Sequence, residues 1–268
     1  MARAFKPSSE ALDVLQRVTT TGTTVTITSG QLARPLYAEV DKVLKALGGK
    51  WDRRAGGHVF ITDPSDALDE VIATGVLTST KTPNQRTGFF PTPGWLAVDL
   101  ADRLEITSKD FVLEPSAGTG ALVKEILARS AACLAVEYDE ARARTIRNTP
   151  RGYGNLRVHT GDFMEVTQEF ILAGEDRLPN VALMNPPFLK VGLGDHIDHV
   201  RHAFELLTPD GRLGAVMPAS VKFRQDTRHA AFRTWVYSHD GDIDDVPEGT
   251  FKESGTDVRT VFVTVSRA

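Results

Sequence analysis

The sequence predicts an α/β fold, in which a mostly parallel sheet of seven strands has helices on both faces and follows a small α+β module. From residue 95 onward, short apolar runs alternate with stretches of helical periodicity. That alternation is typical of parallel strands joined by crossover helices. Before residue 80, helix signals surround short strand and hairpin signals, which favours a separate small unit.

The first 80 residues show, in order, a helix, a strand, a helix, a hairpin and a helix. Ser8 and Ser9 can cap a helix over residues 10–18, and residues 24–28 (TVTIT) alternate like a strand. Apolar residues at helical spacing indicate the next helix: Leu36, Val40, Val43, Leu44 and Leu47. A hairpin pattern over 50–62 and a helical pattern over 64–77 complete the unit.

A polar stretch over 78–88 (TSTKTPNQRTG) has no periodicity and is rich in turn-forming residues, so it predicts a domain linker. We therefore divide the chain into an accessory module over 1–80, a linker over 81–90 and a main domain over 91–268. The seven strands of the main domain are expected at 111–115, 134–139, 156–162, 181–185, 212–218, 242–246 and 258–265. The last two lack a full helix between them, as in an antiparallel pair.

Composition and charge exclude several classes of protein. No run approaches the roughly 18 apolar residues of a membrane span, and the N-terminus lacks the apolar region of a secretory signal, so we expect a cytoplasmic protein. The single cysteine, Cys133, rules out a disulfide framework. The net charge is −4, with +2 in the first 90 residues and −6 in the rest, so a DNA-binding surface must be a local patch.

A glycine-rich turn follows the first strand of the main domain. The strand FVLEP runs into SAGTG (116–120) and then into a helical stretch, so Gly118 and Gly120 lie where the backbone can approach a nucleotide-like cofactor. The spacing differs from the G-x-G-x-x-G dinucleotide pattern, which favours S-adenosylmethionine over NAD.

The next two strands also end in residues that could bind a nucleotide-like cofactor. Glu137 is placed to accept from ribose hydroxyls, Asp162 can accept from an adenine amine, and Phe163 can pack on the ring. The fourth strand ends in NPPF (185–188), which directs Asn185 into the same crevice.

These motifs in this order, FFPTP, EPSAGTG, VEYD, GDF and NPPF, resemble the DNA methyltransferases that modify the N6 amine of adenine, in the family's gamma arrangement. The resemblance covers residues 89 to about 265 and implies a Rossmann-like methyltransferase fold, S-adenosylmethionine as cofactor, no metal and double-stranded DNA as substrate. It assigns Thr92 and its neighbours to the cofactor's carboxylate, and Glu114 to its amino group. The cofactor residues expected are Phe90, Pro91, Thr92, Glu114, Pro115, Ala117, Gly118, Gly120, Glu137, Tyr138, Asp162, Phe163 and Asn185.

The NPPF quartet suits transfer to a planar amine. Two acceptors, the side-chain oxygen of Asn185 and the carbonyl of Pro186, can hold the amine in its nucleophilic form. Pro186 and Pro187 have fixed φ angles and no N–H, which keeps that carbonyl in place. Phe188 can stack on a base extracted from the duplex. By resemblance Phe251 closes the other face, and a core or surface aromatic is the alternative.

Two basic groups are candidates for DNA contact. The hairpin carries Lys50, Arg53 and Arg54 around Trp51, and the segment after the fifth strand carries Lys222, Arg224 and Arg228. The alternatives are a core tryptophan and a solvated helix face. His196, His199 and His202 recur along one helix, but this spacing drifts around it and does not favour a metal site.

We therefore expect an adenine-N6 DNA methyltransferase, of a stand-alone or mobile-element type without an attached endonuclease. Many gamma-type enzymes carry a large recognition domain after the catalytic core, whereas this sequence ends with its last strand. We expect that the N-terminal module supplies specificity, that a partner provides it, or that recognition is loose. The alternatives are methylation of ribosomal RNA or of a protein glutamine amide, and a nucleic-acid-binding module that has lost catalysis.

Overall fold

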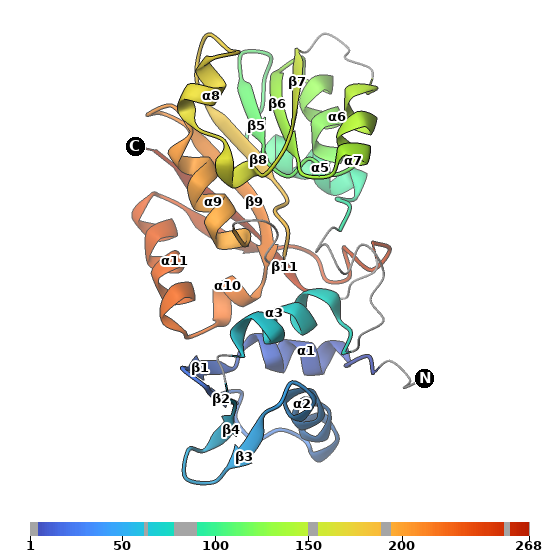
Figure 1. The fold of residues 1–268 in the computed structure, drawn as a ribbon, viewed down its shortest axis with the longest axis vertical. Coiled ribbons are helices and arrows are strands. Elements are labelled where there is room, and N and C mark those ends of the chain that lie inside the picture. Colours follow the sequence, from blue (N-terminus) through green and yellow to red (C-terminus); the bar gives the residue numbers. More distant parts are fainter. Residues whose placement is uncertain are drawn as a thin grey trace.

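The computed structural model describes residues 5–61, 64–77, 90–149, 155–188, 194–254 and 258–267, and it divides into two lobes (Figure 1). The smaller lobe is formed by the N-terminal segment and lies beneath the larger sheet domain. The expected linker over 81–90 lies outside the described residues except for Phe90. No helix in the described segments is long and apolar enough to cross a membrane.

In the described residues of the small lobe, three helices pack against a four-stranded antiparallel sheet of order β1-β2-β4-β3. Its elements are α1 (Ser9–Gln16), β1 (Thr19–Thr21), β2 (Thr24–Thr26), α2 (Arg34–Ala46), β3 (Lys50–Asp52), β4 (Gly57–Val59) and α3 (Ser65–Thr74). The side chain of Ser8 caps α1 by accepting from the N–H of Ala11, and Gly75 ends α3 in the left-handed conformation. The predicted α+β module is therefore present, with β1 as a strand that the pattern did not indicate.

The larger lobe is a seven-stranded sheet of order β10-β11-β9-β8-β5-β6-β7. Its strands are β5 (Phe111–Glu114), β6 (Ala132–Glu137), β7 (Leu156–Thr160), β8 (Val181–Met184), β9 (Arg212–Pro218), β10 (Asp242–Asp245) and β11 (Thr260–Ser266). Strands β5 to β9 pair in parallel, whereas β11 pairs antiparallel with both β9 and β10. The predicted fold class is confirmed.

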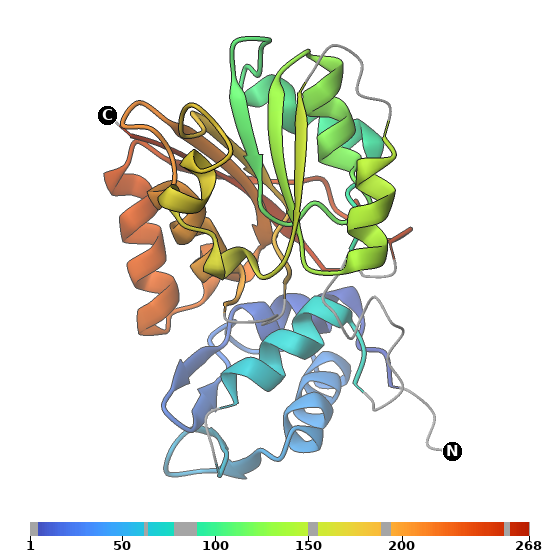
Figure 2. The ribbon, with the colours of Figure 1, turned by 45° about the horizontal axis from the view of Figure 1, so that its top comes forward.

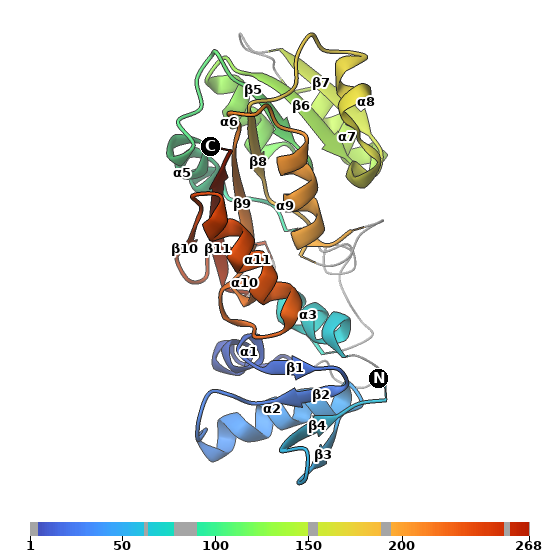
Figure 3. The same ribbon diagram turned by 90° about the vertical axis from the view of Figure 1, so that its left-hand side faces the viewer.

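Helices cover both faces of this sheet (Figures 2 and 3). One face packs against α5 (Gly94–Arg103), α6 (Ala121–Ala128) and α7 (Glu140–Arg147), the other against α8 (Gln168–Leu172), α9 (His196–Glu205) and α11 (Thr227–Ser238). The short helices η1 (Phe163–Glu165) and α10 (Ser220–Phe223) follow β7 and β9. The chain proceeds outward from β5 through β6 to β7, then returns to β8 on the other side of β5. Ligands of such sheets bind at this point of reversal, beyond the carboxyl ends of the strands.

The two lobes are joined by ion pairs and one cation–π contact among the described residues. The guanidinium of Arg224, directly after α10, is fully buried and pairs across the joint with Asp69 on α3. It also pairs with Asp226 of its own lobe at 3.4 Å. Arg259 forms an ion pair with Asp13 on α1 at 2.9 Å. The guanidinium of Arg17 lies over the ring of Phe223, 4.8 Å from the ring centroid. These contacts hold the module against the segments that follow β9.

Candidate active site

A pocket lies beyond the carboxyl ends of β5, β6, β7 and β8, with about 770 Å³ of space when its opening to solvent is included. It gathers residues from four separate strand ends and from the segment before α5. The residues expected from the sequence that line it are Phe90, Pro91, Thr92, Glu114, Pro115, Ala117, Gly118, Glu137, Tyr138, Asp162, Phe163, Asn185, Pro186 and Pro187. The expected cofactor-binding and catalytic residues that do not line the pocket are Gly120, Phe188 and Phe251.

The glycine turn between β5 and α6 forms one side of the pocket. Gly118 and Gly120 have φ angles of +54° and +84°, a region that favours glycine. The N–H of Gly118 donates to Glu137 Oε2 at 2.7 Å, which ties the turn to the end of β6. Gly120 lies behind the pocket as the N-terminal cap of α6.

The carboxylate of Glu137 is held at both oxygens. Oε2 accepts from Gly118, and Oε1 accepts from the N–H of Asp139 at 2.9 Å and from Nε of Arg142 at 2.8 Å. Arg142 lies on α7, lines the pocket and was not predicted to do so. Its backbone N–H donates to Asp139, the residue that caps α7, and this local contact does not indicate that its side chain faces a pocket. The three donors fix the orientation of the carboxylate toward the pocket.

Glu114 is fully buried at the end of β5. Its Oε1 accepts from the N–H of Ser116 at 3.0 Å, and its Oε2 has no hydrogen-bond partner among the described residues. Burial, and to a smaller extent the charge of Glu137, raises the pKa of Glu114 to about 8. A cationic group bound beside it would favour the ionised form. The pocket is thus suited to a ligand that brings a positive charge.

The amide of Asn185 has one orientation fixed by its surroundings. Its Nδ2 donates to the carbonyl of Phe90 and to Oγ1 of Thr92, both at 3.0 Å. The carbonyl can only accept, so the nitrogen must face it. The remaining atom, Oδ1, is buried without a partner among the described residues. The segment before α5 therefore presents Asn185 as an acceptor in the wall of the pocket.

The aromatic residues expected to hold a base pack against each other instead of facing the pocket. Phe188 and Phe251 are 2% and 0% exposed. The ring of Phe188 lies 5.7 Å from that of Phe90 and 6.0 Å, edge to face, from that of Phe251. A planar base needs two parallel ring faces with space between them. The stacking role of Phe188 and Phe251 stays a prediction, and it requires these rings to separate.

The three histidines of α9 have different environments. His199 lines the pocket, which the sequence did not indicate. His202 pairs with the carbonyl of Val166 at 2.9 Å, and His196 is buried near His229 at the joint between the lobes. No group of three or more ligating side chains that could hold a metal occurs in the described segments.

The basic residues of the segment after β9 form ion pairs within the protein. The prediction that Arg224 contacts DNA is wrong, because its guanidinium is fully buried against Asp69 and Asp226. Lys222 pairs with Asp245 at 2.9 Å, and Arg228 pairs with Asp195 at 2.6 Å and with Asp198 at 2.9 Å.

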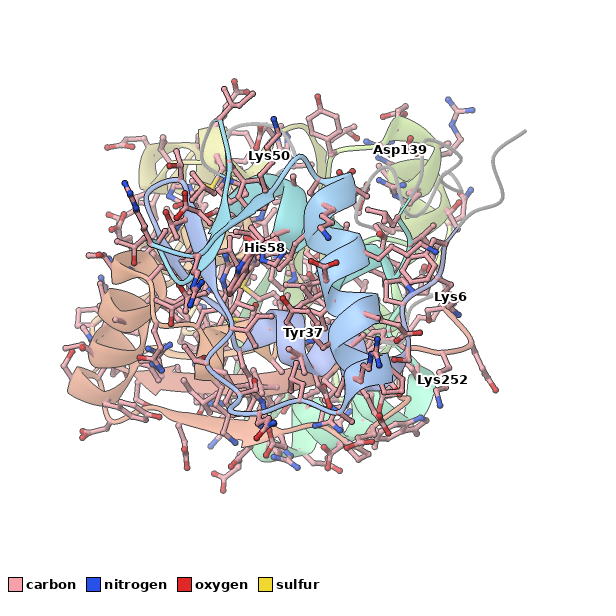
Figure 4. The ribbon with its side chains drawn as sticks, turned by 90° about the horizontal axis from the view of Figure 1, so that it is seen from below. Lys6, Tyr37, Lys50, His58, Asp139 and Lys252 are labelled. Carbon is pink, nitrogen blue, oxygen red and sulfur yellow. The ribbon has the colours of Figure 1, made fainter. Side chains whose placement is uncertain are left out.

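The basic hairpin of β3 and β4 lies on the outer side of the module. Figure 4 shows the module from below, with Lys50 and His58 on this hairpin and Tyr37 on α2. Lys50, Arg53 and Arg54 are exposed, and Trp51 keeps 49% of its surface in solvent. The Trp51 ring packs edge-on against buried His58, whose Nε2 lies 3.0 Å from Asp41 on α2. The hairpin therefore exposes positively charged side chains, and the contacts of Trp51 and His58 hold it against the rest of the module.

The comparisons with known proteins give partial matches in sequence. No protein-family model matches the chain. Over 95 residues it is 32% identical to ribosomal RNA small subunit methyltransferase A of Moorella thermoacetica, a match that covers 33% of this chain and 33% of that protein. A protein of the same description from Clostridium acetobutylicum is 28% identical over 93 residues. The chain spans about a third of the length of the curated relatives it matches.

Solved structures share the fold along most of the chain. A Vibrio vulnificus protein, described as a modification subunit of a type I restriction enzyme, matches with a TM-score of 0.55 at 14% identity, over 85% of this chain and 56% of that one. A Listeria monocytogenes protein, described as a class I S-adenosylmethionine-dependent methyltransferase, matches with a TM-score of 0.54 at 12% identity, over 97% and 87%. The larger lobe thus has the Rossmann-like fold of these methyltransferases, for which S-adenosylmethionine is the expected cofactor.

Proposed function

We propose that this chain is an S-adenosylmethionine-dependent methyltransferase that methylates the N6 amine of adenine in DNA. The observation that carries the proposal is the amide of Asn185. Its nitrogen is bound to Phe90 and Thr92, while its oxygen, in the pocket wall, has no partner among the described residues. An acceptor held in this way suits an incoming N–H group. The adjacent prolines and the order of motifs along the chain support the same reaction.

The reaction needs help because the exocyclic amine of adenine is a poor nucleophile. Its lone pair is delocalised into the ring, and two acceptors aimed at its N–H groups favour the pyramidal form in which that pair is available. In our proposal these acceptors are Oδ1 of Asn185 and the carbonyl of Pro186. S-adenosylmethionine supplies an electrophilic methyl group on a positively charged sulfur. The new bond joins N6 to the methyl carbon, the bond to sulfur breaks, and the amine releases one proton to water.

The residues of the pocket suit this cofactor in charge and in hydrogen bonding. Glu137 can accept from the ribose hydroxyls, since its orientation is already fixed by Gly118 and Arg142. Asp162 can accept from the adenine amine. Oε2 of buried Glu114, which no described residue binds, suits a cationic amino group. The remaining cofactor contacts that we propose, from Phe90, Pro91 and Thr92, are to the methionine carboxylate.

Cofactor binding is expected to strengthen with pH. Because the pKa of Glu114 is raised to about 8 in the free protein, binding a cation beside it below that pH requires release of a proton. The dissociation constant should fall by up to about tenfold per pH unit from pH 6 toward pH 8 and rise again above, where the α-amino group of the ligand loses its own proton. Isothermal titration calorimetry with S-adenosylmethionine, in buffers of different ionisation enthalpy, measures both the affinity and the proton release.

The control for this pH dependence is a pair of matched variants. Glu114→Gln should bind more weakly and lose the dependence on pH, whereas Glu205→Gln on the exposed side of α9 should behave like the wild type. Equal affinity of the wild type at pH 6 and pH 8 would count against the role of Glu114.

A second candidate function, methylation of ribosomal RNA, is favoured by one observation, the sequence match to ribosomal RNA methyltransferases. A glutamine amide in a protein is a further planar nitrogen that the same acceptors would suit. The test is to incubate the protein with radiolabelled cofactor and, separately, with unmethylated genomic DNA, ribosomal RNA and a protein extract. We expect the radiolabelled methyl group to be found in DNA. Label in RNA or protein alone would favour those substrates, and cofactor binding without any transfer would favour a non-catalytic binding module.

The exposed hairpin of β3 and β4 is the part of the module that we propose contacts DNA. Arg53→Glu with Arg54→Glu should weaken binding to duplex DNA and lower the slope of log affinity against log salt by about one for each phosphate that the variant no longer neutralises. The matched control is Lys109→Glu with Lys124→Glu, two exposed residues of the sheet domain. Fluorescence anisotropy over a range of salt concentrations gives the slopes. Unchanged slopes in the hairpin variant would exclude this contact.

A further inference from the structure

His199 is a buried polar side chain in the wall of the pocket. It projects from α9 into the same pocket as Asp162 and Phe163, and only 5% of its surface is exposed. Its ring lies 5.5 Å from that of Phe163. Neither Nδ1 nor Nε2 has a hydrogen-bond partner among the described residues. Buried polar groups usually have a partner, and because His199 lines the pocket, a ligand bound there can supply one.

His199 has both a donor and an acceptor to offer. Burial lowers its pKa to about 4, although Asp162, Asp195 and Asp198 oppose the shift, while His202 adds to it. The imidazole is therefore neutral at physiological pH, with an N–H on one ring nitrogen and a lone pair on the other.

A purine base needs a partner of this kind. Its exocyclic amine donates hydrogen bonds, which a carboxylate such as Asp162 can accept. Its ring nitrogens are acceptors, and a carboxylate cannot serve them. Two other side chains of the pocket with N–H groups already donate within the protein, Arg142 to Glu137 and the amide of Asn185 to Phe90 and Thr92. The imidazole N–H of His199 lies beside Asp162 and Phe163 and has no acceptor in the described segments.

We propose that His199 donates a hydrogen bond to a ring nitrogen of the cofactor's adenine and so contributes to selection of an adenine nucleoside. The inference rests on the proposed function, since it takes the ligand of the pocket to be S-adenosylmethionine. It adds a specificity-determining residue from α9 to the contacts at the strand ends.

The test uses S-adenosylhomocysteine and its 1-deaza, 3-deaza and 7-deaza analogues, each of which replaces one ring nitrogen by carbon. Calorimetry would measure their affinities for the wild type, His199→Phe, His199→Gln and Glu205→Gln, with thermal unfolding as a check on folding. His199→Phe should bind S-adenosylhomocysteine about tenfold more weakly, which corresponds to about 1.4 kcal/mol of binding free energy. His199→Gln keeps an N–H donor and should recover part of this affinity.

The decisive result is how the loss of affinity in His199→Phe differs from one analogue to another. For the analogue that lacks the partner nitrogen, the wild type and His199→Phe should bind equally well. Glu205→Gln, on the exposed side of the same helix, should bind all four ligands with the affinity of the wild type. An equal loss for every ligand would show that His199 is only structural, and full affinity in His199→Phe would show that its ring contributes packing alone. Failure of the wild type to bind S-adenosylhomocysteine would instead contradict the proposed function.

Discussion

Asn185→Ala is expected to lower the rate of methyl transfer by about 100- to 1,000-fold while it leaves cofactor affinity within about threefold of the wild type. The side chain supplies one of the two acceptors that we propose for the target amine, and this contact matters most in the transition state. The cofactor contacts that we propose at Glu114, Glu137 and Asp162 are unaffected by the change. Single-turnover kinetics with labelled cofactor and calorimetry with S-adenosylhomocysteine measure the two quantities separately.

The control for this variant is Asn155→Ala, an exposed asparagine of the same domain that does not line the pocket. It should retain wild-type activity. A second variant, Thr92→Val, removes one of the two acceptors that bind Nδ2 of Asn185 and should lower the rate by a smaller factor. Parallel loss of cofactor binding and methyl transfer in Asn185→Ala would show that Asn185 is needed for the pocket itself and would contradict the assigned role.

Arg224→Ala is expected to lower the free energy of unfolding by about 3 kcal/mol, because removal of one partner leaves a carboxylate without its counter-ion. Arg224 is fully buried and pairs with Asp69 across the joint between the lobes. About a quarter of the Asp69 side chain, 24%, remains in solvent, which places the effect toward the low end of the range for buried pairs. Urea denaturation followed by circular dichroism measures the difference.

The sign of the pH dependence follows from Asp69. Burial raises the pKa of Asp69, and the charge of Arg224 opposes that shift. Without Arg224 the pKa rises further, so the penalty of the unpaired carboxylate should shrink as pH falls from 7 toward 5. The matched variant Arg224→Met with Asp69→Leu replaces both charges and should recover most of the stability that Arg224→Ala removes. A destabilisation that is the same at both pH values, and that persists in the double variant, would show that the pair with Asp69 does not account for the contribution of Arg224.

Most of the pocket could be predicted because its residues follow strand ends. Parallel strands of one sheet bring their carboxyl ends to the same edge, so Glu114, Glu137, Asp162 and Asn185 must lie near one another once the strands are recognised. This reasoning needs only the order of the apolar runs along the chain.

Arg142 and His199 could not be predicted in the same way, because they reach the pocket from helices. Which side of a helix faces a ligand depends on how the helix crosses the sheet, and neither residue has a local pattern that determines this. The spacing of the three histidines of α9 raised only the question of a metal. Their separate environments became visible in the tertiary structure.

The prediction for Arg224 failed for a related reason. A cluster of arginines and lysines in sequence indicates a basic surface only when the acids that neutralise it are absent. Here the partner Asp69 lies 155 positions earlier in the chain, on a helix of the other lobe. β1 was missed because its sequence, Thr19–Thr21, has no alternation of apolar and polar residues to mark a strand.

Identification of the methylated base would test whether this chain methylates the N6 amine of adenine in DNA. Unmethylated DNA incubated with the protein and isotopically labelled S-adenosylmethionine is digested to nucleosides and analysed by mass spectrometry, with Asn185→Ala in parallel. We expect labelled N6-methyladenine from the wild type and almost none from the variant. Labelled 5-methylcytosine, or label in DNA that does not depend on Asn185, would contradict it.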